Sequence, residues 1–210
     1  MTGFTLLGGI EGAYYINLRD TAEVPSWTLP TLTYHEAAPG HHLQISLQQE
    51  SEAAPKYMNL LGFSSYVEGW GLYAEQLADE LGAYENDPIG QIGYVQSLMF
   101  RAARLVVDTG IHAMGWSRDK AIAYMIEQTG HDPVFMTAEV DRYASQPGQA
   151  LSYMMGLLKL KELRARAEAA LGPKFDQRRF HNALIDQGAM PLPLLEQRIN
   201  SWIASEKGRA

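Results

Sequence analysis

The sequence predicts a mainly α-helical protein with at most a small β element near the N-terminus. Apolar residues recur at helical spacing over most of the chain, and clusters of glycine and proline divide it into segments of ordinary helix length. The chain has 210 residues, of which 46% are hydrophobic, and this is enough to bury one sizeable core. We therefore expect a single helical domain covering residues 1–210.

The N-terminal part contains the one segment with the character of a strand. Residues 13–18, Ala-Tyr-Tyr-Ile-Asn-Leu, are rich in aromatic and β-branched side chains, which favour a strand. Pro30 then stands at a position typical of the first turn of a helix. We expect this helix to run through His35.

Further helices are expected between breaks rich in glycine and proline. Asn-Asp-Pro and Gly-His-Asp-Pro are examples of such breaks, because they end one helix and start the next. The expected ranges are 63–83, 89–115, 118–129, 134–145, 148–171, 174–186 and 193–205.

Ten residues that start at Tyr34 carry the chemistry of the chain. They read Tyr-His-Glu-Ala-Ala-Pro-Gly-His-His-Leu and hold three of the six histidines. A hydrolytic zinc site uses imidazole and carboxylate ligands, keeps one position open for water, and places a second carboxylate beside that water as general base. His35 and Glu36 would supply one ligand and the base. His41 or His42 would supply the second ligand.

The spacing of these histidines requires a break in the helix. In the motif His-Glu-x-x-His the two rings share one face of a helix, but the fourth residue after His35 is Pro39. On a straight helix His41 would lie about 240° around the helix axis from His35. His42 would lie on the same face as His35, but about 10 Å further along the axis. Pro39 cannot donate to the preceding turn, so we expect one helix with a kink or bulge between the ligands.

The helix expected at 63–83 offers further carboxylates. Glu68, Glu75 and Asp79 share a stripe next to its apolar face. Gly69 and Gly71 each cost this helix about 1 kcal/mol relative to alanine. We therefore expect another backbone or a substrate to approach closely there.

Three segments together resemble the bacterial domain-of-unknown-function 885 family, which is similar to the gluzincin zinc peptidases. They are the motif at His35, Val-Glu-Gly-Trp-Gly-Leu-Tyr-Ala-Glu at 67–75, and Tyr-Ala-Ser-Gln-Pro-Gly-Gln-Ala-Leu-Ser-Tyr at 143–153. Usual members are longer and carry a helical region before this part. The resemblance thus implies a multi-helix gluzincin-like fold, with a preceding region or a homo-oligomer completing the substrate cleft.

The resemblance also implies roles for individual residues. Gly40-His41 lines up with the Gly-His that ends the gluzincin motif, so His35, His41 and Glu68 would hold one Zn²⁺, with His42 as the alternative ligand. Glu36 would be the general base. Glu75 would lie behind the ligands, or alternatively it would form a thermolysin-like pair with Asp79 at the metal. Tyr153 would donate a hydrogen bond to the oxyanion.

Two later segments contain weaker candidates. Arg104, Asp108 and His112 are spaced so that Asp108 can pair with either neighbour across one helical turn, and a buried arginine could hold a substrate carboxylate. Gln149 near Tyr153, and His181, are further candidates for substrate binding.

Composition excludes several classes of function. The net charge of −7 disfavours nucleic acid as a partner. The absence of cysteine excludes disulfides and thiolate ligands, so any metal must be held by nitrogen and oxygen. The sequence shows neither a signal peptide nor a membrane span, and it suggests a cytoplasmic protein. We expect a zinc metallopeptidase acting on peptides, or alternatively an inactive metal-stabilised helical module.

Overall fold

The computed structural model describes residues 13–16, 21, 24–51 and 61–209, and these residues are mainly helical, as expected. A short 3₁₀ turn, η2 (Ser26–Thr28), precedes the first α-helix. The α-helices are α1 (Leu29–Glu36), α2 (His41–Glu50), α3 (Ser64–Glu80), α4 (Pro88–Met114), α5 (Arg118–Thr129), α6 (Pro133–Ser145), α7 (Gln149–Leu171), α8 (Gln177–Ile185) and α9 (Leu192–Lys207). A second 3₁₀ turn, η4 (Gly172–Lys174), joins α7 to α8.

The strand expected at 13–18 is not found where it can be checked. Residues 13–16 have no regular secondary structure, and residues 17 and 18 lie outside the described part of the chain. A strand is stable only when its backbone groups bond to a partner strand, and the described residues form none. Aromatic and β-branched composition alone was therefore misleading.

Most helix boundaries match the sequence prediction because the caps are local. The side chains of Asp87, Ser117, Asp132 and Asp176 accept hydrogen bonds from backbone N–H groups in the first turns of α4, α5, α6 and α8. Helix α5 spans the expected 118–129 at both ends. The η4 turn accounts for the largest shift of a start, since α8 begins at Gln177 rather than at 174.

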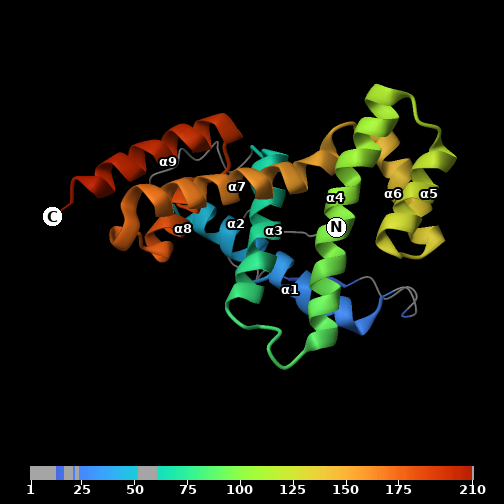
Figure 1. Ribbon diagram of the computed structural model, residues 1–210, viewed down its shortest axis with the longest axis horizontal. Coiled ribbons are helices and arrows are strands. Elements are labelled where there is room, and N and C mark those ends of the chain that lie inside the picture. Colours follow the sequence, from blue (N-terminus) through green and yellow to red (C-terminus); the bar gives the residue numbers. More distant parts are fainter. Residues whose placement is uncertain (1–12, 17–20, 22–23, 52–60, 210) are drawn as a thin grey trace.

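The helices bury two apolar clusters, which α7 connects (Figure 1). The larger cluster is formed mainly by α3, α7, α8 and α9, and its fully buried side chains include Tyr73, Leu163 and Phe180. The smaller one lies between α4, α5 and α6 and includes Met125 and Met136. Helix α1 packs against α3 and α4 between these two regions (Figure 1).

Helices α3 and α7 approach each other at two glycines. A Cβ atom placed on Gly69 would lie only 2.5 Å from the Cα atom of Gly156, and one on Gly156 only 2.0 Å from the carbonyl oxygen of Ser65. The expectation that a second backbone approaches Gly69 is therefore confirmed. This contact fixes α3, which carries the carboxylates of the candidate site.

Replacing Gly69 by alanine should destabilise the protein by about 1–3 kcal/mol, the usual cost of overpacking a tight interface. The new methyl group would press on backbone atoms of α7, which cannot rotate away. Urea unfolding would measure the change. Gly62→Ala is the control, because a Cβ atom there would meet no atom of the described residues within 4 Å. Equal stability of both variants would contradict the close crossing.

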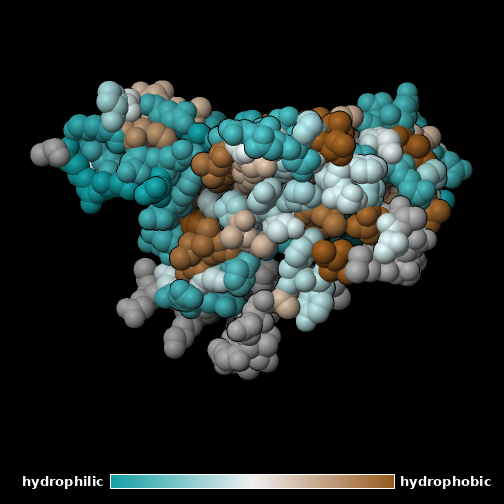
Figure 2. Space-filling model, turned by 90° about the horizontal axis from the view of Figure 1, so that it is seen from below, coloured by the Kyte–Doolittle hydropathy of each residue, from teal (hydrophilic) through white to brown (hydrophobic). Residues whose placement is uncertain are grey.

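Part of the surface is apolar. Figure 2 shows apolar side chains gathered in patches between polar ones on the face seen from below. Helix α4 contributes Ile89 and Ile92, which are 59% and 62% exposed. Among the described residues, no helix combines the length and the apolar character needed to cross a bilayer.

Candidate metal centre

The segment that carries the histidines forms two helices rather than one kinked helix. Helix α1 ends at Glu36, a turn with a cis Ala38–Pro39 peptide follows, and α2 starts at His41. The expectation of a kink within one helix is therefore wrong. The indole N–H of Trp70 on α3 donates to the carbonyl oxygen of Pro39 at 3.0 Å, which ties the turn to α3.

The break brings three of the predicted site residues together. The Nε2 atoms of His35 and His41 lie 3.1 Å apart. Glu68 Oε2 lies 3.6 Å from His35 Nε2 and 3.3 Å from His41 Nε2. Ligands at about 2.0–2.2 Å from a tetrahedral zinc ion are separated from one another by about 3.3–3.5 Å. The three atoms therefore have nearly the spacing that one zinc ion needs.

Each histidine is held through its other ring nitrogen. Nδ1 of His35 lies 2.7 Å from Glu75 Oε1, and Nδ1 of His41 lies 3.3 Å from Gln44 Oε1. Such partners keep the proton on Nδ1 and leave Nε2 free to bind a metal. Gly71 makes room for this arrangement, since a Cβ atom there would lie 2.6 Å from Cε1 of His35.

Glu75 is fully buried and shares its carboxylate between two helices. Its Oε1 faces His35, and its Oε2 accepts a hydrogen bond from Ser97 Oγ of α4 at 2.6 Å. Ser97 in turn accepts from Arg101 at 2.9 Å. Asp79 instead accepts from Gln91 on the exposed side. The geometry therefore places Glu75 behind a histidine and does not pair it with Asp79 at the cluster.

The charges within the cluster stabilise one another. Burial disfavours charge on His35, but hydrogen bonds with Glu68 and Glu75 outweigh burial and raise its pKa to about 9. Burial acts to raise the pKa of Glu68, but His35 and His41 lower it well below its usual range. Glu68 is thus an anion, and its side chain is 20% exposed, so the cluster has one side open to solvent.

Of the residues assigned to proton transfer and oxyanion binding, Tyr153 contacts the cluster, and Glu36 follows His35 in the sequence. Glu36 is the last residue of α1, directly after His35, and its Oε2 is buried with no hydrogen-bond partner among the described residues. The ring of Tyr153 on α7 stacks against the ring of His35, with centroids 6.4 Å apart. Gln149 Nε2 lies 3.4 Å from the Tyr153 hydroxyl.

Other sequence candidates have different positions. His42 is exposed, whereas His41 is buried, so only His41 reaches the other two residues. Neither expected pair of Asp108 forms. Asp108 accepts from the backbone N–H of Gly148 at 3.1 Å, and Arg104 donates to Glu139 and Tyr143. His112 lies 3.0 Å from the Tyr143 carbonyl oxygen, so its contact is with the backbone and not with Asp108.

His181 belongs to an aromatic cluster. Its Nε2 lies 3.0 Å from the Tyr73 hydroxyl, and its ring contacts Trp70 and Phe180. Burial, with a smaller contribution from Arg164, lowers the pKa of His181 to about 4. These contacts give it a packing role.

His181→Phe should reduce the loss of stability on acidification. The unfolded chain takes up a proton at His181 near pH 6.5, but the folded chain does so only near pH 4. The stability from neutral His181 is therefore complete above pH 6.5 and is lost as the pH falls toward 4. A fully buried histidine would give about 1.4 kcal/mol per pH unit, and half-burial should reduce this to less than half.

Urea unfolding at pH 7 and pH 5, in the presence of a chelator, would measure the change in the free energy of unfolding with pH. Wild type should lose more stability than His181→Phe between these two pH values. Identical losses would mean that His181 titrates normally in the folded protein.

Two residues at the cluster were not found from the sequence. Gln44 lies three residues after His41 on α2, so helical spacing was an available signal. Ser97 gave none, because it meets Glu75 only through the packing of α4 on α3.

The chain belongs to the family described as "Bacterial protein of unknown function (DUF885)", whose sequence profile matches residues 5–199. No curated protein gives a significant match. The similar solved structures include two proteins. One is a "putative lipoprotein" from Colwellia psychrerythraea, at 49% identity over 90% of this chain with a TM-score of 0.88. The other is a "putative lipoprotein of unknown function" from Shewanella oneidensis, at 26% identity over 83% with a TM-score of 0.77.

This chain corresponds to only part of those proteins. The matched region covers 32% of each of the two solved chains.

Proposed function

We propose that this member of the DUF885 family is a zinc-dependent hydrolase that cleaves peptide bonds. The observation that carries the proposal is the convergence of His35, His41 and Glu68, whose ligand atoms all lie within 4.8 Å of one another. Two imidazoles and one carboxylate are the ligand set of many catalytic zinc sites.

The surroundings of these residues also favour zinc. All donors are nitrogen and oxygen, and two of them are neutral imidazoles when a metal binds, which suits zinc better than magnesium or calcium. Glu75 and Gln44 hold the rings through Nδ1. Three protein ligands leave a fourth position free, as catalysis requires.

The chemistry follows from the residues around the cluster. A bound zinc ion would act as a Lewis acid that makes a water molecule nucleophilic near neutral pH. Glu36 would accept a proton from that water and pass it to the departing amine, a role that suits a carboxylate oxygen without another partner. The Tyr153 hydroxyl would donate to the oxygen of the attacked carbonyl.

The finer assignments are also proposals. We infer a gluzincin-like catalytic half from the motif, with one Zn²⁺ per chain and a peptide as substrate. The sequence suggests the cytoplasm, while the solved relatives are described as lipoproteins, so attachment to a membrane surface is the alternative location. Fractionation of cells that express the natural protein distinguishes the two.

A metal-stabilised module without activity is the competing proposal. The observation that favours it is that this chain corresponds to only 32% of the length of the solved relative. The remainder of such proteins, or a second copy of this chain, would then be needed to complete a substrate cleft.

Elemental analysis together with a peptide-cleavage screen tests the proposal. We expect one zinc per chain after dialysis against metal-free buffer, and cleavage of library peptides that chelator stops and added zinc restores. Stoichiometric zinc without cleavage, both alone and with the complementary part of a longer relative, would favour the module. Absence of zinc would refute both proposals.

A further inference from the structure

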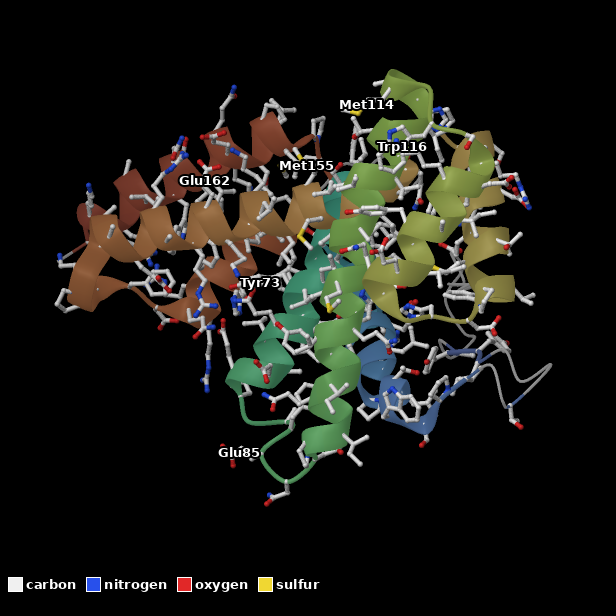
Figure 3. All side chains as sticks on the ribbon, turned by 45° about the vertical axis from the view of Figure 1, so that its right-hand side comes forward. Tyr73, Glu85, Met114, Trp116, Met155 and Glu162 are labelled. Atoms are coloured by element: carbon white, nitrogen blue, oxygen red, sulfur yellow. The ribbon has the colours of Figure 1, made fainter. Side chains whose placement is uncertain are left out.

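A cavity lies next to the candidate metal centre. It has a volume of about 440 Å³. Its walls are formed by residues between Val24 and Leu32, by α4 between Gly93 and Arg104, and by residues between Gly130 and Phe135 at the start of α6. Figure 3 shows α1 and the loop between α5 and α6 on the same side of α4, far from the carboxyl end of α4 marked by Met114 and Trp116. Glu75, the partner of His35, also lines it.

Three side chains of this cavity keep a buried nitrogen without a hydrogen-bond partner among the described residues. The atoms are Nε of Arg101, Nη1 of Arg104 and Nδ1 of His131. Arg104 is only 5% exposed. Buried polar atoms that lack a partner cost free energy. Two of these three are guanidinium donors and the third is a ring nitrogen that donates in one tautomer, so together they indicate a ligand that accepts hydrogen bonds.

The rest of each arginine is firmly held, so these nitrogens have fixed positions. Arg101 donates through Nη1 to Ser97, and Arg104 donates through Nε to Tyr143 and through Nη2 to Glu139. His131 packs its ring between Phe100 and Phe135, with centroids 5.0 and 5.6 Å away. The site is therefore preorganised before a ligand enters.

The acidic residues of the cavity are already engaged. Glu75 uses both oxygens for His35 and Ser97, and Asp132 caps the start of α6. Glu75 Oε1 also lies 3.9 Å from Nη2 of Arg101, and Asp132 accepts from the backbone of α6 through Oδ1. Neither carboxylate is hydrogen-bonded to any of the three nitrogens. The remaining walls are largely apolar and include Trp27, Phe100 and Phe135.

We propose that this cavity binds a carboxylate on an apolar ligand, with Arg101, Arg104 and His131 as donors. Paired guanidinium groups recognise carboxylates well, and the apolar walls fit the rest of such a ligand. Because it names the substrate, this inference rests on the proposed function: the carboxylate belongs to a peptide.

The position of Tyr153 connects the cavity to the metal centre. The Arg104 guanidinium lies 4.7 Å from the centre of the Tyr153 ring, and the same ring stacks on His35. A carboxylate held at the arginines would therefore anchor a peptide that passes Tyr153 on its way to the cluster.

The carboxylate has two sources, the C-terminus of a peptide or an acidic side chain. Three probes separate them: N-acetylphenylalanine, its amide, and N-acetylglutamic acid α-amide. The first carries only a terminal carboxylate, the second carries none, and the third carries only a side-chain carboxylate.

Binding of each probe is measured by ligand-observed NMR in metal-free protein, after chelator has been dialysed away. Without metal, the result does not depend on hydrolysis or on coordination. We expect at least one acid to bind ~10-fold or more tightly than the neutral amide, since a charged hydrogen-bonded group contributes at least this factor. Preference for the first acid indicates a carboxypeptidase, and preference for the third indicates recognition of acidic side chains. Equal binding of all three would overturn the proposal.

Variants identify the donors. Arg101→Gln and Arg104→Lys should each remove most of the preference for the acid. Arg142→Gln is the matched control, because Arg142 also pairs with Glu139 but does not line the cavity. A preference that survives both test variants would overturn the assignment. The wild-type comparison of acid and amide remains decisive if a variant does not fold.

Discussion

Glu36→Gln should lower peptide hydrolysis by at least ~10²-fold and leave the zinc content unchanged, because a positioned acid–base group contributes at least that much. Glutamine has the size and reach of glutamate but does not accept a proton from water. Glu36 is not one of the three residues that converge at the cluster. Removing its charge therefore affects proton transfer and not the ligands.

The measurement pairs turnover of a cleaved library peptide with zinc content and thermal unfolding of the same samples. Glu85→Gln serves as the control, since Glu85 is exposed in the loop between α3 and α4 (Figure 3). Unchanged turnover of Glu36→Gln with full zinc would remove Glu36 from the mechanism. Loss of zinc would instead give it a role at the metal.

The helices could be predicted from the sequence because their starts and ends depend on neighbouring residues. Asp132 followed by Pro133 caps α6 without help from the rest of the chain. The turn at Pro39 was different. A proline at that position permits either a kink or the end of a helix, and the contact of Trp70 with the Pro39 carbonyl comes from α3, thirty-one residues later in the sequence.

The candidate site divides in the same way. His35, His41 and Glu68 stand out by residue type, and the structure brings them together. The spacing allowed Asp108 to pair within its own helix, but its carboxylate accepts from the backbone N–H of Gly148, forty residues away. His131 and Gln44 were not selected, because their role depends on which helices pack together. A residue whose partner lies on another helix is not visible in a one-helix pattern.

Removing one ligand should abolish stoichiometric zinc binding. We expect this result for His35→Ala and Glu68→Ala, since each leaves only two of the three converging ligand atoms. Glu75→Ala should have a smaller effect. Glu75 orients His35 through Nδ1 and does not face the centre of the cluster, so its loss should weaken zinc affinity by about 10–100-fold.

This order of effects tests the arrangement itself. Asp79→Asn is the control on the same helix, and it should leave affinity unchanged, because Asp79 bonds only to Gln91 among the described contacts. Zinc affinity is measured by competition with a chromophoric chelator, and circular dichroism checks that each variant is folded. If Glu75→Ala lost all zinc binding and Glu68→Ala retained it fully, Glu75 would be the ligand. If Asp79→Asn then also lost zinc, the thermolysin-like pair would replace the ligand set proposed here, because two carboxylates one helical turn apart would be acting together at the metal.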